Sequence, residues 1–164
     1  MKSIIKSIIY CRVAILAITA IFLMFTPFVL GTNGRYNGNY TYTGFELAFG
    51  YRFIGGSTSS LKVLTSSFAG IMVFIFFIII TILACLNIFM KNSKLNMLFN
   101  IIIIVLSIVS IVFLFCSPTS LMFKSIDGNP ISGYSIGIGA IIDAIIMLII
   151  IFYIFVIKIL SKDK

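Results

Sequence analysis

The chain has 164 residues, of which 61% are hydrophobic and 10% are charged, and its formal net charge is +8. Soluble domains are close to half apolar and a quarter charged, so this composition indicates a chain whose solvent is lipid. Histidine, the commonest metal ligand and the usual general base near neutral pH, is absent. We therefore expect no enzyme, no cofactor and no metal centre, and we attribute the positive charge to membrane topology rather than to nucleic-acid binding.

Four apolar segments are long enough to cross a bilayer as helices. They cover residues 8–30, 68–90, 98–116 and 135–157. The first segment is interrupted by Arg12, whose guanidinium we expect to reach the membrane interface near the start of the helix. Residues 91–97 then form a short turn between the second and third segments, and residues 158–164 form a tail.

The positions of the basic residues predict the orientation of these segments. Of the 12 Lys and Arg residues, most lie in the N-terminal region, the 91–97 turn and the C-terminal region: Lys2, Lys6, Arg12, Lys91, Lys94, Lys158, Lys162 and Lys164. Short basic segments stay on the cytoplasmic side of a membrane. We expect a multi-pass protein of a cell membrane with both termini in the cytoplasm and with residues 31–67 and 117–134 outside.

The two outer loops carry signals for strands and turns. In the first loop, Asn37-Gly38 is typical of a tight hairpin turn, and polar and aromatic residues alternate over residues 39–43. Residues 45–49 are interpreted as a second strand. In the second loop, Asp127-Gly128 predicts a turn and residues 121–126 a strand. These signals predict a small β-containing cap.

The two halves of the chain share one pattern. Each reads as an apolar segment, a proline, an outer loop, a start rich in small residues, a second apolar segment and a lysine-containing end. If this is an internal repeat, both outer loops donate strands to one sheet. The predicted fold is a membrane all-α protein, a four-transmembrane-helix bundle over residues 1–164 with a small extracellular cap formed by both loops.

Asp143 is the acid that lies inside a predicted span, where an ionised carboxylate is costly. Gly139 and Ser135 precede it at spacings of four residues, on one stripe of a helix. One hypothesis is an ion or proton site. The other is a structural acid, protonated, bonded to a hydroxyl or ion-paired; the candidate partners are Thr19, Ser66, Ser67, Ser110, Lys62 and Arg52. The structural hypothesis predicts a lower folding yield for Asp143→Leu than for Asp143→Asn.

Aromatic and basic residues of the first outer loop are the candidates for contact with a partner. They are Tyr36, Tyr40, Tyr42, Arg35 and Arg52. Tyrosine and arginine are enriched at recognition surfaces, but tyrosine also populates the lipid headgroup belt, so both interpretations stay open. The cysteines Cys11, Cys85 and Cys116 form no close motif, and we expect buried thiols rather than a disulfide or a zinc site.

The order of segments resembles the claudin-type tetraspan architecture in topology: four spans, a long first outer loop, a shorter second one, and strands in both. The tryptophan-containing signature and loop cysteines of that family are absent, so its adhesion and barrier functions are not implied. The segment Thr-Gly-Phe-Glu-Leu-Ala-Phe-Gly over residues 43–50 is similar to small four-span proteins of low-GC bacteria. That resemblance implies a bacterial membrane and no particular activity.

The sequence therefore predicts a non-enzymatic accessory or scaffold protein that contacts the lipid bilayer and a membrane-protein partner through its outer cap and its helix faces. The alternative is a homo-oligomeric ion channel or small transporter in which Asp143 faces the path.

Overall fold

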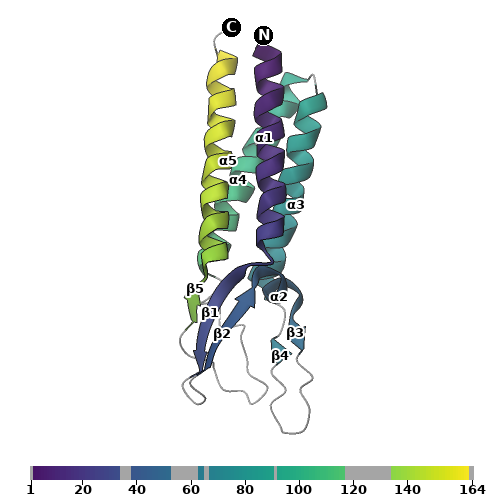
Figure 1. The fold of residues 1–164 in the computed structure, drawn as a ribbon. Helices are drawn as coiled ribbons and strands as arrows, with labels where there is room; N and C mark the ends of the chain where they lie inside the picture. The colour runs from purple at the N-terminus through teal and green to yellow at the C-terminus, as the bar shows by residue number, and fades with distance from the viewer. Residues whose placement is uncertain are drawn as a thin grey trace.

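A computed structural model describes residues 2–33, 38–52, 63–64, 67–90, 92–116 and 134–162. Within these residues, four long helices run side by side, with the two chain ends at one end of the bundle and the strands at the other (Figure 1). The helices are α1 (Lys2–Leu23), α3 (Phe68–Phe89), α4 (Ser93–Cys116) and α5 (Ile138–Lys162). Each contains a stretch long and apolar enough to cross a membrane.

The four long helices pack in a ring. α1 contacts α3 and α5, and α4 contacts the same two helices, so α1 and α4 lie diagonally opposite each other. Each helix turns a stripe of residues spaced by three or four positions into the shared core. On α1 this stripe consists of Tyr10, Val13, Ala17 and Ala20, and Met24 continues it directly after the helix. Its alanines allow the neighbouring backbones to approach closely.

The first apolar segment ends as a helix earlier than the sequence predicts. Residues 8–30 were expected to form one span, but α1 starts at Lys2 and ends at Leu23, and β1 (Pro27–Asn33) follows. Proline lacks an N–H and disfavours helical backbone in the residue before it, so the helix cannot continue through Thr26-Pro27. The last predicted segment likewise begins with a strand, β5 (Tyr134–Ile136), before α5 starts at Ile138.

The strands come from both connecting segments. Among the described residues, β1 pairs antiparallel with β2 (Gly38–Thr43) on one side and with β5 on the other. The register places Leu30 opposite Thr41 and Ser135. The strand alternation predicted over residues 39–43 corresponds to β2, which pairs with β1. β5 lies almost wholly within the predicted fourth segment, so the predicted contribution of residues 117–134 to the sheet stays a prediction. The turn at 34–37 and the strand predicted over residues 121–126 lie outside the described residues.

The second strand predicted over residues 45–49 is wrong, because these residues form the short helix α2 (Gly44–Phe49). A capping box starts this helix: the Thr43 N–H donates to Glu46 Oε2 at 2.8 Å, and the Glu46 N–H donates to Thr43 Oγ1 at 3.2 Å. The helix ends at Gly50, whose φ of 81° suits glycine. Two further short strands, β3 (Tyr51–Arg52) and β4 (Val63–Leu64), pair antiparallel beyond it.

The described strands do not support the predicted repeat. β1 directly follows the first long helix of its half, whereas β5 directly precedes the second long helix of its half. The two strands therefore occupy different places in the pattern.

The sheet is joined to the bundle by close backbone contacts. The Gly137 N–H donates to the Phe28 carbonyl at 2.7 Å, and the Ser67 N–H donates to the Leu47 carbonyl at 2.7 Å. At Gly137 a side-chain carbon would collide with the Pro27 carbonyl oxygen and would lie 2.7 Å from the Phe28 carbonyl carbon. Glycine is required here because β1 passes directly over the start of α5.

We predict that Gly137→Ala lowers the free energy of unfolding. Overpacking of a core costs about 1–3 kcal/mol, and we expect a loss in the upper part of that range. The reason is that the added carbon meets backbone atoms, which cannot rotate away. The measurement is the thermal unfolding midpoint of the purified protein in a mild detergent. Gly44→Ala is the matched control, because the three atoms nearest to its added carbon belong to the Phe28 side-chain ring, at 3.0 Å, and not to backbone. Equal midpoints for the two variants would contradict this contact.

Candidate functional site

Asp143 lies on the inward stripe of α5. The residues of this stripe are buried and spaced by three or four positions: Ala140, Asp143, Met147, Ile150 and Ile154. The Asp143 side chain is 0% exposed, and neither carboxyl oxygen has a hydrogen-bond partner among the described residues. Polar groups in such positions are normally hydrogen-bonded, so this carboxyl group requires an explanation other than packing.

Two serines of the neighbouring helix are buried in the same way. Ser107 and Ser110 on α4 are 0% exposed, and their hydroxyls have no partner among the described residues. Ser110 lies six residues before the end of α4 and Asp143 five residues after the start of α5. With a rise of 1.5 Å per residue, both lie about 8–9 Å inward from the sheet end of the bundle. Asp143 and Ser110 therefore share one layer of the core.

The other two members of the predicted intramembrane stripe lie elsewhere. Ser135 belongs to β5 and is exposed, and its hydroxyl donates to the Leu30 carbonyl at 3.5 Å. Gly139 is buried where β1 crosses α5, and an added side-chain carbon there would collide with Thr26 Oγ1. Ser135 and Gly139 thus hold the sheet against the helix, and they do not form a site with Asp143.

Apart from Ser110, the predicted partners of Asp143 are engaged in other contacts or lie outside the described residues. Thr19 is exposed and donates to the Ile15 carbonyl, and Ser67 accepts from the Gly70 N–H as the cap of α3. Lys62 and Ser66 lie outside the described residues, as does the side chain of Arg52.

The predicted outer contact residues are only partly described. Tyr40 and Tyr42 lie on β2, at positions opposite Gly31 and Val29, and Arg52 lies on β3. The Tyr42 ring is half-buried and packs against the core, so it stabilises the cap instead of presenting a free surface. Arg35 and Tyr36 lie outside the described residues, so their predicted role stays a prediction.

All three cysteines are exposed, which corrects the expectation of buried thiols. Cys11 and Cys85 lie on the outer faces of α1 and α3, and Cys116 ends α4. A thiol is a small, weakly polar group, and an apolar surrounding outside the bundle accommodates it as well as a core does.

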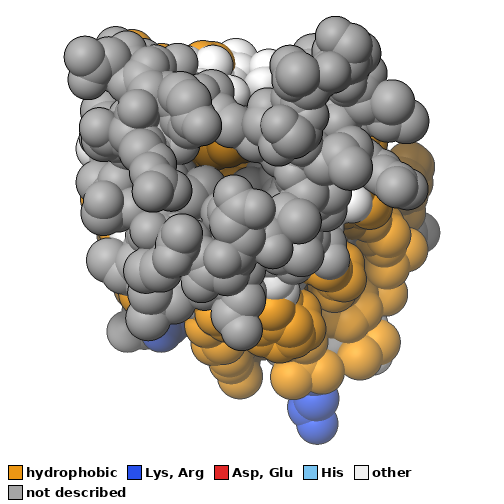
Figure 2. Space-filling model, turned by 90° about the horizontal axis from the view of Figure 1, so that it is seen from below, with side chains coloured by type: hydrophobic (Ala, Val, Ile, Leu, Met, Phe, Trp, Pro, Cys, Tyr) orange, Lys and Arg blue, Asp and Glu red, His pale blue; other side chains and the backbone are white. Residues whose placement is uncertain are grey.

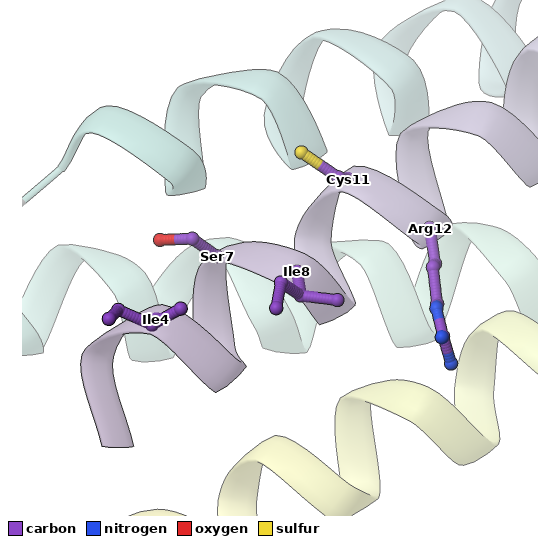
Figure 3. Close-up of a pocket in the computed structure, with 5 residues that line it drawn as sticks. All are labelled: Ile4, Ser7, Ile8, Cys11 and Arg12. Atoms are coloured by element: carbon purple, nitrogen blue, oxygen red, sulfur yellow. The ribbon is translucent and has the colours of Figure 1, made fainter. Parts of the chain in front are cut away.

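Sequence reasoning missed the position of Arg12. Because α1 begins near Lys2, Arg12 is the ninth residue of the 20-residue apolar stretch Ile4–Leu23 and thus lies near its middle. It lines an open groove of about 400 Å³ together with Ile4, Ser7, Ile8 and Cys11 (Figure 3). An exposed arginine at the middle of a membrane-spanning helix raises the free energy of inserting that helix into a bilayer by about 2.5–3.5 kcal/mol.

A polar cluster lies in the half of the bundle that contains the chain ends. Asn100 Oδ1 on α4 accepts from the Tyr10 hydroxyl of α1 at 3.1 Å and from Asn87 Nδ2 of α3 at 3.2 Å. Hydrogen bonds between helices fix their relative register, so this cluster is a structural device. The three residues come from three different apolar segments, and no pattern in their positions predicted that they would meet.

No family model matches the chain, and no curated protein or solved structure is significantly similar to it. The functional argument therefore depends on the residues and their geometry alone.

We predict that Asp143→Leu is at least as stable as the wild type, with a gain of up to about 1–3 kcal/mol. Leucine has the same branching as aspartate, and its introduction removes an unpartnered buried polar group without loss of a hydrogen bond. This reverses the order expected from the sequence for Asp143→Leu and Asp143→Asn. The measurement is the thermal midpoint in mild detergent.

Ile150→Ala, on the same stripe of α5, is the control for sensitivity, because loss of this buried side chain costs about 2–5 kcal/mol. A lower midpoint for Asp143→Leu, with Asp143→Asn unchanged, would show that the carboxyl group has a stabilising polar partner.

Proposed function

We propose that the chain is a multi-pass membrane protein that acts as a non-enzymatic accessory or scaffold subunit. The observation that carries the membrane assignment is the apolar outer surface of the bundle. Large hydrophobic side chains point outward on all four long helices, including Phe22, Phe89 and Phe152, which are 67%, 82% and 65% exposed. In the view from the sheet end, the described side chains along the flanks are almost all hydrophobic (Figure 2). Such a surface is stable in lipid and not in water.

The distribution of charge supports a cytoplasmic location for both termini of a bacterial cell-membrane protein. The end of the bundle opposite the sheet contains basic residues from three helices: Lys2, Lys6, Lys94, Lys158 and Lys162. Lysines near the ends of spanning helices favour the cytoplasmic side. The sheet and α2 would then form the outer cap.

The chemistry of the described residues supports an accessory role. Their two acids are Glu46, which is used in the capping box of α2, and Asp143, which is buried in the core. Neither lies beside a nucleophile in a cleft, as an acid–base pair in an active site would. The features that a partner can reach are the cap and the outer faces of the helices.

A second candidate function is an ion path, and Asp143 with Ser107 and Ser110 favours it. Three fully buried polar side chains without partners among the described residues are costly, and a cation or proton would compensate for this cost. Because Asp143 is enclosed by its own chain, such a path would run inside one bundle. A pore between copies, lined by a ring of Asp143 side chains, is not supported by this placement.

The accessory function is tested by the mass of the native complex, extracted with a tag from its own membrane in mild detergent. We expect a stoichiometric second protein. An unrelated tagged four-helix membrane protein, extracted in parallel, controls for carry-over. A uniform homo-oligomer without a second protein would contradict the accessory function, and ion flux through vesicles containing the wild type but not Asp143→Leu would then support the second candidate.

A further inference from the structure

We propose that the groove around Arg12 receives a membrane-spanning helix of the partner protein, and that an aspartate or glutamate of this helix pairs with Arg12 near the middle of the bilayer. The proposal rests on the accessory function above and names the surface and the chemistry of the partner.

The depth of Arg12 is the first argument. Eight residues of the apolar stretch Ile4–Leu23 precede it and eleven follow it. At 1.5 Å per residue its Cα lies about 12 Å from one end of the stretch and about 17 Å from the other. In Figure 3 its side chain extends outward from α1 on the side where α5 runs. A guanidinium at this depth is stabilised by an opposite charge in the same layer.

No acid among the described residues lies beside Arg12 in that layer. Of the four acids, Asp127 and Asp163 lie outside the apolar spans, and Glu46 lies on α2 at the sheet end. Asp143 is 0% exposed inside the bundle. A second copy of the chain presents the same surface and therefore also lacks an accessible carboxylate at this depth. Charge complementarity thus selects a different protein as the occupant.

The shape of the groove suits a helix. Ile4, Ile8 and Arg12 follow one another at four-residue spacing and lie along one stripe of α1. Ser7 and Cys11 have the same spacing on the adjacent stripe, and their small side chains allow a second helix to approach closely. Residues of both stripes border the open volume of about 400 Å³.

The experiment places a photo-crosslinking residue, benzoylphenylalanine, at Ile8 in the full-length chain and irradiates the native membrane. The matched control is the same residue at Val105, which is 50% exposed on α4, the helix diagonally opposite α1. We expect a protein adduct from position 8 and at least tenfold less of it from position 105. The crosslinked partner peptide should lie in an apolar segment within two helical turns of an aspartate or glutamate.

Variants at Arg12 then test the ion pair. Arg12→Leu should reduce the adduct at least tenfold, whereas Arg12→Lys should retain most of it. Arg12→Asp combined with arginine at the partner's acid should restore it. The thermal midpoint of Arg12→Leu in detergent should equal that of the wild type, because Arg12 is exposed and its side chain makes no hydrogen bond or ion pair among the described residues.

The remaining outcomes overturn the proposal. They are adducts with lipid alone, adducts with a second copy, adducts with a helix that lacks an acid at this depth, the absence of an adduct, and an adduct that Arg12→Leu leaves unchanged. If the native complex contains a stoichiometric partner and one of these outcomes is found, the groove is not the docking site but the accessory function stands. If no partner is found in the native complex, the accessory function itself fails.

Discussion

The apolar outer surface of the bundle is the constraint on which the rest of the structure depends. In the lipid that we propose as its surroundings, the medium outside the helices is as apolar as the core, so burial of large side chains gives little preference for one packing over another. Close contact of backbones supplies that preference. α1 presents Ala14, Ala17 and Ala20 to the core, and Gly137 allows β1 to cross the start of α5. The hydrogen bond from Gly137 to Phe28 then joins the two halves of the chain at the sheet end.

The same constraint makes each polar group inside the apolar layer informative. Asn100 accepts hydrogen bonds from Tyr10 and Asn87, so this cluster contributes to helix register. Asp143 in the core and Arg12 on the outer surface have no such partners among the described residues. Packing does not explain either residue, and both would be costly in the lipid surroundings that we propose for the bundle. A partner at Arg12 explains the exposed charge, whereas Asp143 is the residue to test for ion or proton binding.

Much of the fold was predictable from the residues. The four apolar segments correspond to the long helices, and α3 ends at Phe89, one residue before the predicted end of its segment. Strand alternation after Asn37-Gly38 indicated the hairpin. The boundary between α1 and β1 was not predictable from hydrophobicity, because residues 27–30 are apolar in either state. The helix at residues 44–49 was missed because Thr43 and Glu46 form a capping box, which outweighs the strand-like spacing of Phe45, Leu47 and Phe49. The positions of the candidate site residues were less predictable than the helices and strands.

Arg12 was expected near a membrane interface because the start of the first helix was placed at residue 8, whereas α1 begins at Lys2. Whether the buried Asp143 side chain has a hydrogen-bond partner depends on which helices pack against α5. A single sequence contains little information on which helices become neighbours.

The most direct test of the account is the depth of the outer helix faces in a bilayer. A fluorescent label is attached to single cysteines at Val105 and Leu148, which are 50% and 57% exposed, and at Thr41 on the cap, in a background that lacks the native cysteines. In reconstituted vesicles, the account predicts that brominated lipid tails quench the labels at 105 and 148, and that aqueous iodide quenches the label at 41. Quenching by iodide at positions 105 and 148 would show that these faces contact water, and would contradict a membrane-spanning bundle.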